Sequence, residues 1–456
     1  MTPTDPRGNP VSTGSAAARD AAETALWRMM SFYDPPLADL DAATAADPGW
    51  CLPHAMKAGF LLSLTEPSLL DEAARHLAAA RALDADATAR ERAHLEALAF
   101  GIEGRWHQAC RVWDDLLLEH PRDALALQWA HLWDFYRGDA HHLRARPARV
   151  LPEWDEADPL HPYVLALYAF GLEENHLYPQ AEEAGRRALV ADARVPWAVH
   201  AVAHVMEMQG RFEDGAAWLR QHQPGWAEGN GFAAHLWWHM GLFRLEALDT
   251  AGVLRLVDAH LSRDALQITL QRVDAAAMLW RLHLLGVAVD GCFRDLVAAW
   301  PLADGDAGYY AFNDLHVLIA LAGAGDLGGA ERWLSRCAER VLAADDAARA
   351  NRAMAREVGL PLMRGFLAFA RGEFDAAAQT LHGVRAQAAG FGGSHAQRDL
   401  VDQTLLAAAG AAGTAGAKAI GRALLNERLL AKPATPLTRH WAQQLGLAGR
   451  VPPNGG

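Results

Sequence analysis

Apolar residues along this chain recur with the spacing of amphipathic helices, and runs that alternate as strands do are almost absent. Ala and Leu dominate these segments, and prolines fall between them, as at Pro48, Pro121, Pro159 and Pro196. Because proline disrupts helix interiors and is tolerated at their first turn, these positions mark helix boundaries. The pattern predicts an all-α protein made of short helices.

A second pattern repeats along the chain: a glycine, an aromatic residue two positions later and an alanine three positions after that. It is clearest at Gly104, Trp106 and Ala109. The aromatic or large position recurs, with weaker matches included, at Leu70, Trp106, Tyr178, Phe212, Leu248, Leu327 and Phe374. Intervals of 34 and 36 residues separate several of these positions. The spacing matches the second half of a tetratricopeptide repeat, a 34-residue helix–turn–helix unit.

This repeat predicts a tetratricopeptide-type helical-hairpin solenoid, a right-handed superhelix of about seven to nine helix pairs. We expect it to be one domain over residues 19–448, with disordered tails at 1–18 and 449–456. An inter-repeat loop is expected between Asp139 and His161, where the register slips. Gly365, seven residues before Gly372, fills the small position at which paired helices approach closely.

The charge balance disfavours a nucleic-acid partner. The formal net charge is −13, from 55 acidic and 42 basic residues, and no Lys/Arg block occurs. The four cysteines are far apart, without metal-ligand spacing, as expected of thiols in a reducing compartment. There is no secretory signal and no apolar stretch of membrane-spanning length. We therefore predict a cytoplasmic protein with neither a nucleic-acid nor a membrane partner.

Polar residues interrupt the helices that would line the concave side of the array. Counting back from Phe212 places Trp197, His200, His204 and Glu207 at the positions facing the groove. A histidine at i and another at i+4 project from the same helix face. Two such pairs occur, because His235 and His239 follow on the next inner helix, with Trp238 beside them and Gly241 as its close-packing residue.

Further candidates follow along the chain. Asp274 interrupts an apolar segment, and His316 lies one turn after Asn313 on a later inner helix. In the string GGSHAQRD, Ser394 and Gln397 have the spacing of a helix-capping box, and Arg398 could face inward.

Three chemistries remain open for these residues. The histidines His200, His204, His235 and His239 could bind a divalent metal ion, although the glutamate of the H-E-x-x-H motif is missing. His200, His204 or His316 could act as an acid or base with Glu207 or Asp274. Alternatively, the histidines could join neighbouring helices by hydrogen bonds and set the repeat register. No nucleophile elbow, P-loop, Rossmann fingerprint or EF-hand loop occurs, so whether the chain is an enzyme stays undecided.

The strings WAVHAVAHVMEM, HLWWHMGLF, VDAAAMLWRL, FNDLHVLIAL and GGSHAQRD resemble the tetratricopeptide repeat protein 38 family over roughly residues 20–445. The resemblance implies the fold and no settled activity. It also implies that the following are family-typical polar positions: His200, His204, Glu207, His235, His239, Asp274, Asn313, Asp314, His316, Gln397 and Arg398. His395 departs from the family pattern, in which a smaller amide is expected.

The first functional hypothesis is binding of a peptide, protein or other ligand in the concave groove. The alternative is an enzyme, or a protein that binds a metal ion or small molecule, with a His/Asp/Glu pocket at the centre of the superhelix. Grooves that bind peptides clamp them with Lys, Arg and Asn. The inner positions of this chain carry His, Trp, Glu and Asp instead, which favours a closed pocket. The substrate and the oligomeric state cannot be read from the sequence.

Overall fold

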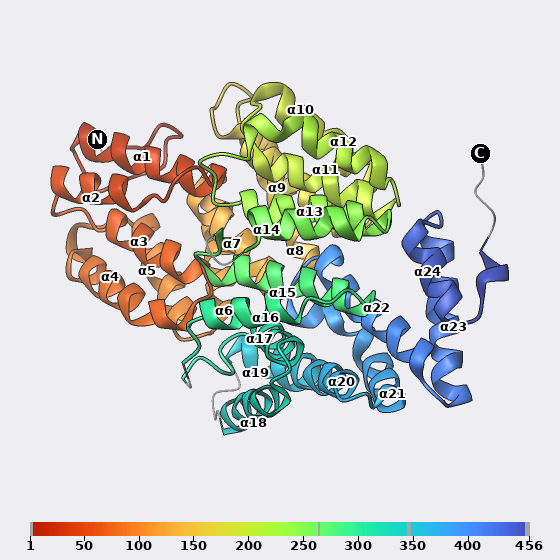
Figure 1. Ribbon diagram of the computed structural model, residues 1–456. Coiled ribbons are helices and arrows are strands. Elements are labelled where there is room, and N and C mark those ends of the chain that lie inside the picture. The colour runs from red at the N-terminus through yellow and green to blue at the C-terminus, as the bar shows by residue number, and fades with distance from the viewer. Residues whose placement is uncertain (1–2, 263–264, 304, 344–347, 452–456) are drawn as a thin grey trace. The chain divides into compact units, whose positions relative to one another are not determined.

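The computed structural model describes residues 3–262, 265–303, 305–343 and 348–451. Across these ranges the regular structure is helical (Figure 1), and extended backbone pairs only in two isolated bridges, Thr4–Pro10 and Tyr33–Asn230. The predicted all-α class is therefore confirmed. In the same ranges, no helix is long and apolar enough to cross a membrane.

The chain divides into two compact units, although the sequence predicts a single array. Unit 1 comprises the described parts of Met1–Val202, His222–Ala233 and Ala348–Ala350. Its helices are α1 (Ala16–Ser31), α2 (Leu37–Ala46), α3 (Leu52–Ser63), α4 (Leu70–Ala82), α5 (Ala89–Ile102), α6 (Trp106–Glu119), α7 (Ala124–Tyr136), α8 (Ala140–Val150), α9 (His161–Glu173), α10 (Tyr178–Ala191) and the first half of α11 (Pro196–Met208).

Unit 2 holds the rest of the described chain. After the second half of α11, its helices are α12 (Phe212–His222), α13 (Ala233–Glu246), α14 (Thr250–His260), α15 (Thr269–Leu284), α16 (Asp290–Ala299), α17 (Ala311–Gly323), α18 (Leu327–Ala343), α19 (Ala350–Met354), α20 (Leu360–Ala370), α21 (Phe374–Arg385), α22 (His395–Ala411), α23 (Ala415–Ala431) and α24 (Pro436–Gln444). A π-helical turn, Ala355–Gly359, joins α19 to α20.

The turn inside each hairpin explains the glycine–aromatic pattern of the sequence. Gly104, Gly210 and Gly372 adopt left-handed φ angles of 75°, 70° and 76°. The next residue then donates its N–H to the carbonyl five positions back, for example from Arg105 N to Phe100 O at 2.8 Å. This arrangement closes the first helix in the manner of a Schellman motif. The second helix begins one residue later, which is why an aromatic residue follows the glycine by two positions.

Two weak copies of the pattern have the same turn without a glycine. His176 and Leu248 adopt φ angles of 60° and 58°, and the N–H of Asp249 reaches Arg244 O at 2.9 Å. The sequence places Leu248 at the large position that opens the second helix. Instead, Leu248 is the turn residue, and α14 begins two positions later, at Thr250.

Neighbouring helices approach each other closely at two glycines that the sequence predicts as close-packing positions. A Cβ atom at Gly365 would lie 2.6 Å from Leu381 Cδ2, across the α20–α21 hairpin. A Cβ at Gly241 would lie 2.6 Å from Met278 Cε, between α13 and α15. Both distances are too short for real contacts, so these two positions fix how tightly the helices pack.

Two sequence predictions about irregular segments are wrong. Residues 3–18 are not a disordered tail, because Arg7, Val11 and Thr13 are buried and α1 begins at Ala16. The Arg7 guanidinium contacts the Glu23 carboxylate at 2.5 and 2.6 Å. The predicted loop between Asp139 and His161 is helical in its first half, where α8 contains Pro147, and the irregular connection is confined to the part after the short 3-10 turn Leu151–Glu153. Residues 1–2 and 452–456, which belong to the predicted tails, lie outside the described residues.

Replacing Gly365 with Leu should lower the free energy of unfolding by about 1–3 kcal/mol, because the added side chain overpacks the contact with Leu381. The matched control is Gly383→Leu in α21, where an added Cβ would meet nothing within 4 Å. Urea denaturation of both variants is the measurement. Equal stability of the two variants would mean that the hairpin contact at Gly365 is wrongly placed.

Candidate functional site

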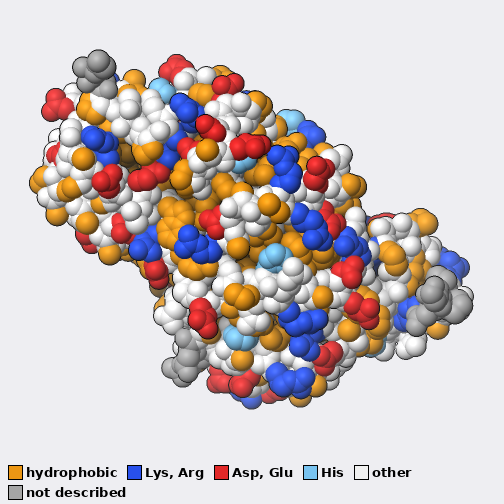
Figure 2. Space-filling model, turned by 90° about the horizontal axis from the view of Figure 1, so that it is seen from above, with side chains coloured by type: hydrophobic (Ala, Val, Ile, Leu, Met, Phe, Trp, Pro, Cys, Tyr) orange, Lys and Arg blue, Asp and Glu red, His pale blue; other side chains and the backbone are white. Residues whose placement is uncertain are grey.

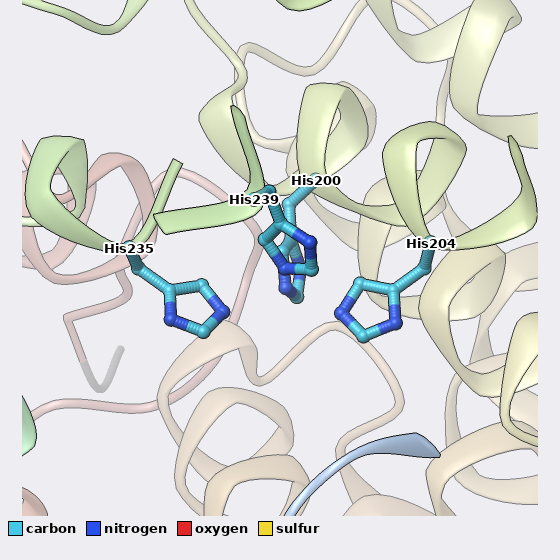
Figure 3. A group of neighbouring side chains, drawn as sticks. All are labelled: His200, His204, His235 and His239. Carbon is cyan, nitrogen blue, oxygen red and sulfur yellow. The ribbon is translucent and has the colours of Figure 1, made fainter. Parts of the chain in front are cut away.

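Four histidines from two inner helices lie close together. His200 and His204 are on α11, His235 and His239 are on α13, and one ring nitrogen from each lies within 4.8 Å of the others. Figure 3 shows the rings of His200 and His239 between those of His204 and His235. The ring centroids of His204 and His239 are 4.5 Å apart, and those of His235 and His239 are 4.8 Å apart. We call this group the histidine quartet.

The unit boundary falls inside α11, between Val202 and Ala203. Three quartet members thus belong to unit 2, namely His204, His235 and His239. His200 lies one turn before His204 on the continuous helix α11. His200, His204 and His239 are fully buried or nearly so, while the side chain of His235 is 14% exposed. The structure therefore brings both sequence-predicted histidine pairs together, and their role stays a prediction.

Two carboxylates orient two of these rings. The Nδ1 atom of His235 lies 2.7 Å from Asp274 Oδ2, and the Nδ1 atom of His239 lies 3.3 Å from Glu207 Oε2. An ionised carboxylate only accepts hydrogen bonds and favours the tautomer in which Nδ1 carries the proton and Nε2 the lone pair, whereas a protonated carboxyl can itself donate to Nδ1. The sequence predicts all four residues, but not these pairings, because Asp274 is 39 positions away from His235.

Burial shifts the protonation of this region towards neutral groups. It lowers the pKa of His239 well below 6.5, and the neighbouring His204 and His235 lower it further. Burial also raises the pKa of Glu207 to about 8, which the Lys432 ammonium opposes. At neutral pH the His239 ring is therefore an uncharged imidazole, the form that binds metal ions.

Charged residues that the sequence reasoning missed surround Glu207. Lys432 Nζ donates to Glu246 Oε1 at 2.9 Å and to the backbone oxygen of Glu207 at 3.3 Å. Nearby in the chain, Arg428 forms an ion pair with Asp399. Glu246, Arg428 and Lys432 are at most 12% exposed. Their only sequence signal is the i,i+4 spacing of Arg428 and Lys432, which is common on solvated helix faces.

Arg281 joins α15 to the start of α22. Its guanidinium is fully buried, lies 5.3 Å from the centre of the Trp238 ring and donates to Ala396 O at 2.7 Å. Trp238 in turn stacks on His235, with centroids 5.2 Å apart. Trp238 thus packs between a quartet member and a buried cation, and Arg281 acts as a clamp on the backbone of α22.

Several other predicted site residues have local structural partners. Gln397 completes the predicted capping box, since its Oε1 accepts from Ser394 N at 3.0 Å and its N–H reaches Ser394 Oγ at 3.3 Å. Arg398 donates to Gly393 O. Trp197 lies in an aromatic cluster of unit 1, 5.1 Å from Phe170 between ring centroids. These contacts give the three side chains a structural explanation.

The α17 candidates are buried and lie outside the quartet. His316 Nδ1 donates to Phe312 O at 2.7 Å, and burial lowers the pKa of His316 to about 4. Asp314 Oδ1 accepts from Gly308 N at 3.1 Å, and burial raises the pKa of Asp314 to about 7. Asn313 is 8% exposed on the same helix. At neutral pH the His316 ring is therefore uncharged, and any catalytic role would start from this form.

No family model matches the chain. The resemblance to the tetratricopeptide repeat protein 38 family is therefore not confirmed. Among solved structures, the chain is similar to the human IFIT1 dimer with m7Gppp-AAAA. The identity is 14%, the match covers 96% of this chain and 93% of that one, and the TM-score is 0.43.

The predicted exclusion of nucleic-acid partners is contradicted, because that similar structure is a complex with m7Gppp-AAAA. The exclusion is withdrawn. Its physical weakness is that net charge sums over the whole surface, whereas an interface depends on where the basic groups lie. On the face drawn in Figure 2, Lys and Arg side chains lie among Asp and Glu.

Replacing Asp314 with Asn should stabilise the protein more at about pH 8 than at about pH 5, by roughly 1–3 kcal/mol. The pKa of Asp314 is raised to about 7 in the folded state. Its contribution to stability is therefore complete below the unfolded pKa and is lost as the pH rises through 7. Urea denaturation of wild type and variant at both pH values measures the difference. A pH-independent effect would show that the buried carboxyl ionises without cost.

Proposed function

We propose that this helical-repeat protein is a binding protein whose ligand is small and is held by the buried polar centre of unit 2. The centre consists of His204 and Glu207 from α11, His235 and His239 from α13, and Asp274 from α15. His200 extends it by one turn of α11. The observation that carries this proposal is the convergence of imidazoles and carboxylates from three helices, two pairs of which are in hydrogen-bond contact.

Burial supports a small ligand over a peptide. His204 and His239 are 0% exposed and Glu207 is 6% exposed, so an extended peptide could not contact them without displacing helices. Burying polar groups costs free energy that apolar residues would not incur. Their concentration in one place is therefore better explained by a ligand than by packing. Peptide binding in a groove stays a prediction that no contact of the described residues favours.

The proposal leaves the chemistry of the alternative hypothesis open. Acid–base catalysis by a histidine with Glu207 or Asp274 would use the same side chains.

We also propose, on the five sequence strings alone, that the chain is a relative of the tetratricopeptide repeat protein 38 family.

Native mass spectrometry of the purified full-length chain tests the proposal. We expect a non-covalently bound species on the wild type that is lost from the double variant His204→Gln/His239→Gln. The melting temperature of the double variant should equal or exceed that of the wild type, because binding sites are commonly strained. His382→Gln, an exposed histidine on α21 of the same unit, is the matched control and should retain the species. A wild type with the mass of the bare chain, or a double variant that keeps the species, would refute the proposal.

A further inference from the structure

We infer that the histidine quartet binds one divalent transition-metal ion through an imidazole nitrogen of each ring. This inference rests on the proposed function and names its ligand. Four steps support it: the spacing of the nitrogens, the carboxylates behind two rings, the kind of donor atom, and the contrast with a second cluster of possible ligands in unit 1.

The spacing of the nitrogens is close to that of a tetrahedral site. Zinc–nitrogen distances of about 2.0–2.1 Å place the ligand nitrogens about 3.3 Å apart. In the quartet the corresponding atoms lie within 4.8 Å of one another. The farthest pair would thus have to close by up to about 1.5 Å on binding the ion. In Figure 3 one ring nitrogen of His204 and one of His235 face the two central rings.

The carboxylates orient the rings as metal sites require. A histidine that binds a metal through one nitrogen usually donates its other N–H to a carboxylate, a carbonyl or water, which fixes the ring and makes it a better ligand. Asp274 contacts Nδ1 of His235, and Glu207 contacts Nδ1 of His239. Both contacts involve Nδ1, so in these two rings the metal ion would be bound through Nε2. They come from two different helices, α15 and α11, so the arrangement is not a by-product of one helix face.

The donor set selects the class of metal. Imidazole suits zinc, copper, nickel and iron, whereas magnesium and calcium prefer oxygen ligands. The quartet offers nitrogen only, and the cysteines Cys51, Cys110, Cys292 and Cys337 are not part of it. Four imidazoles complete a tetrahedral shell, so the bound ion would join α11 to α13 with no position left for a substrate.

In a second group of possible metal ligands, in unit 1, arginine side chains already contact a carboxylate that a metal ion would need. Asp134, Asp139 and His142 also lie within reach of a common ion. However, Arg137 Nη2 lies 2.7 Å from Asp134 Oδ1, and Arg146 Nε lies 2.9 Å from Asp134 Oδ2. Two guanidinium groups already neutralise this carboxylate. In the quartet, by contrast, the rings of His235 and His239 lie against the carboxyl groups of Asp274 and Glu207.

The experiment uses full-length protein without a histidine tag, freed of metal by a chelator and titrated with zinc and with cobalt chloride. Calorimetry should give one ion per chain, and bound cobalt should show the visible ligand-field spectrum of tetrahedral coordination. His239→Gln should weaken binding at least 100-fold. Asp274→Asn, which keeps every ligand, should weaken it about 10- to 100-fold. His382→Gln should bind as wild type does.

Folding is checked separately, because His239 is fully buried. If His239→Gln fails to fold, His235→Gln, whose side chain is partly exposed, takes its place. A wild type that binds no zinc or cobalt, or a folded ligand variant that binds as tightly as His382→Gln, overturns the inference. If the wild type binds no metal yet carries an organic species that the double variant loses, the inference fails and the proposed function stands. If it carries neither, both fail.

Discussion

No helix hairpin of this chain can bury its apolar face alone, and the rest of the structure follows from that constraint. Each pair has to close tightly on itself and then pack against the next. The left-handed turn at Gly104, Gly210 and Gly372 provides the first condition, because it reverses the chain within two residues. The missing side chains at Gly241 and Gly365 provide the second, because they let helix axes approach. Inner helices are consequently covered on most sides, and any polar residue on them needs a partner.

Unit 2 meets this requirement with a connected set of charges and imidazoles. Asp274 and Glu207 contact two histidine rings, and Lys432 contacts both Glu246 and the backbone of Glu207. Arg281 satisfies carbonyls at the start of α22. Such a network is stable only when most of its members are satisfied. The metal ion that we propose for the quartet would add a positive charge shared by the four rings.

The fold is largely predictable from the sequence, because helix period and turn chemistry are local. The second helices begin at Trp106, Tyr178, Phe212, Leu327 and Phe374 as the repeat predicts. Leu248 is misplaced by two positions because a non-glycine residue occupies the left-handed turn, for which composition gives no signal. The burial of Arg7 is missed for a different reason. Its partner Glu23 lies on α1, and the sequence of a polar segment does not show that it packs against a helix.

The candidate site is predictable in its members and not in its connections. Helical spacing places His204 and Glu207 on one face and His235 and His239 on another, since i,i+3 and i,i+4 residues must share a side. Which carboxylate reaches which ring depends on how three helices cross, and that is set by packing far along the chain. Glu246 and Lys432, 186 positions apart, form an ion pair that no local pattern indicates.

A buried histidine elsewhere in the protein shows what a purely structural role looks like. In unit 1, His94 Nε2 lies 3.0 Å from Asp123 Oδ2, and Arg90 Nε lies 2.6 Å from the same oxygen. Although burial raises it, Arg90 and His94 hold the pKa of Asp123 well below its usual value, and Asp123 also caps α7. The single carboxylate of Asp123 thus contacts one imidazole ring and one guanidinium group. In the quartet, two carboxyl groups contact two of four rings whose nitrogens lie within 4.8 Å of one another. Register alone would need only one such ring per helix pair, so the surplus of imidazoles favours a ligand.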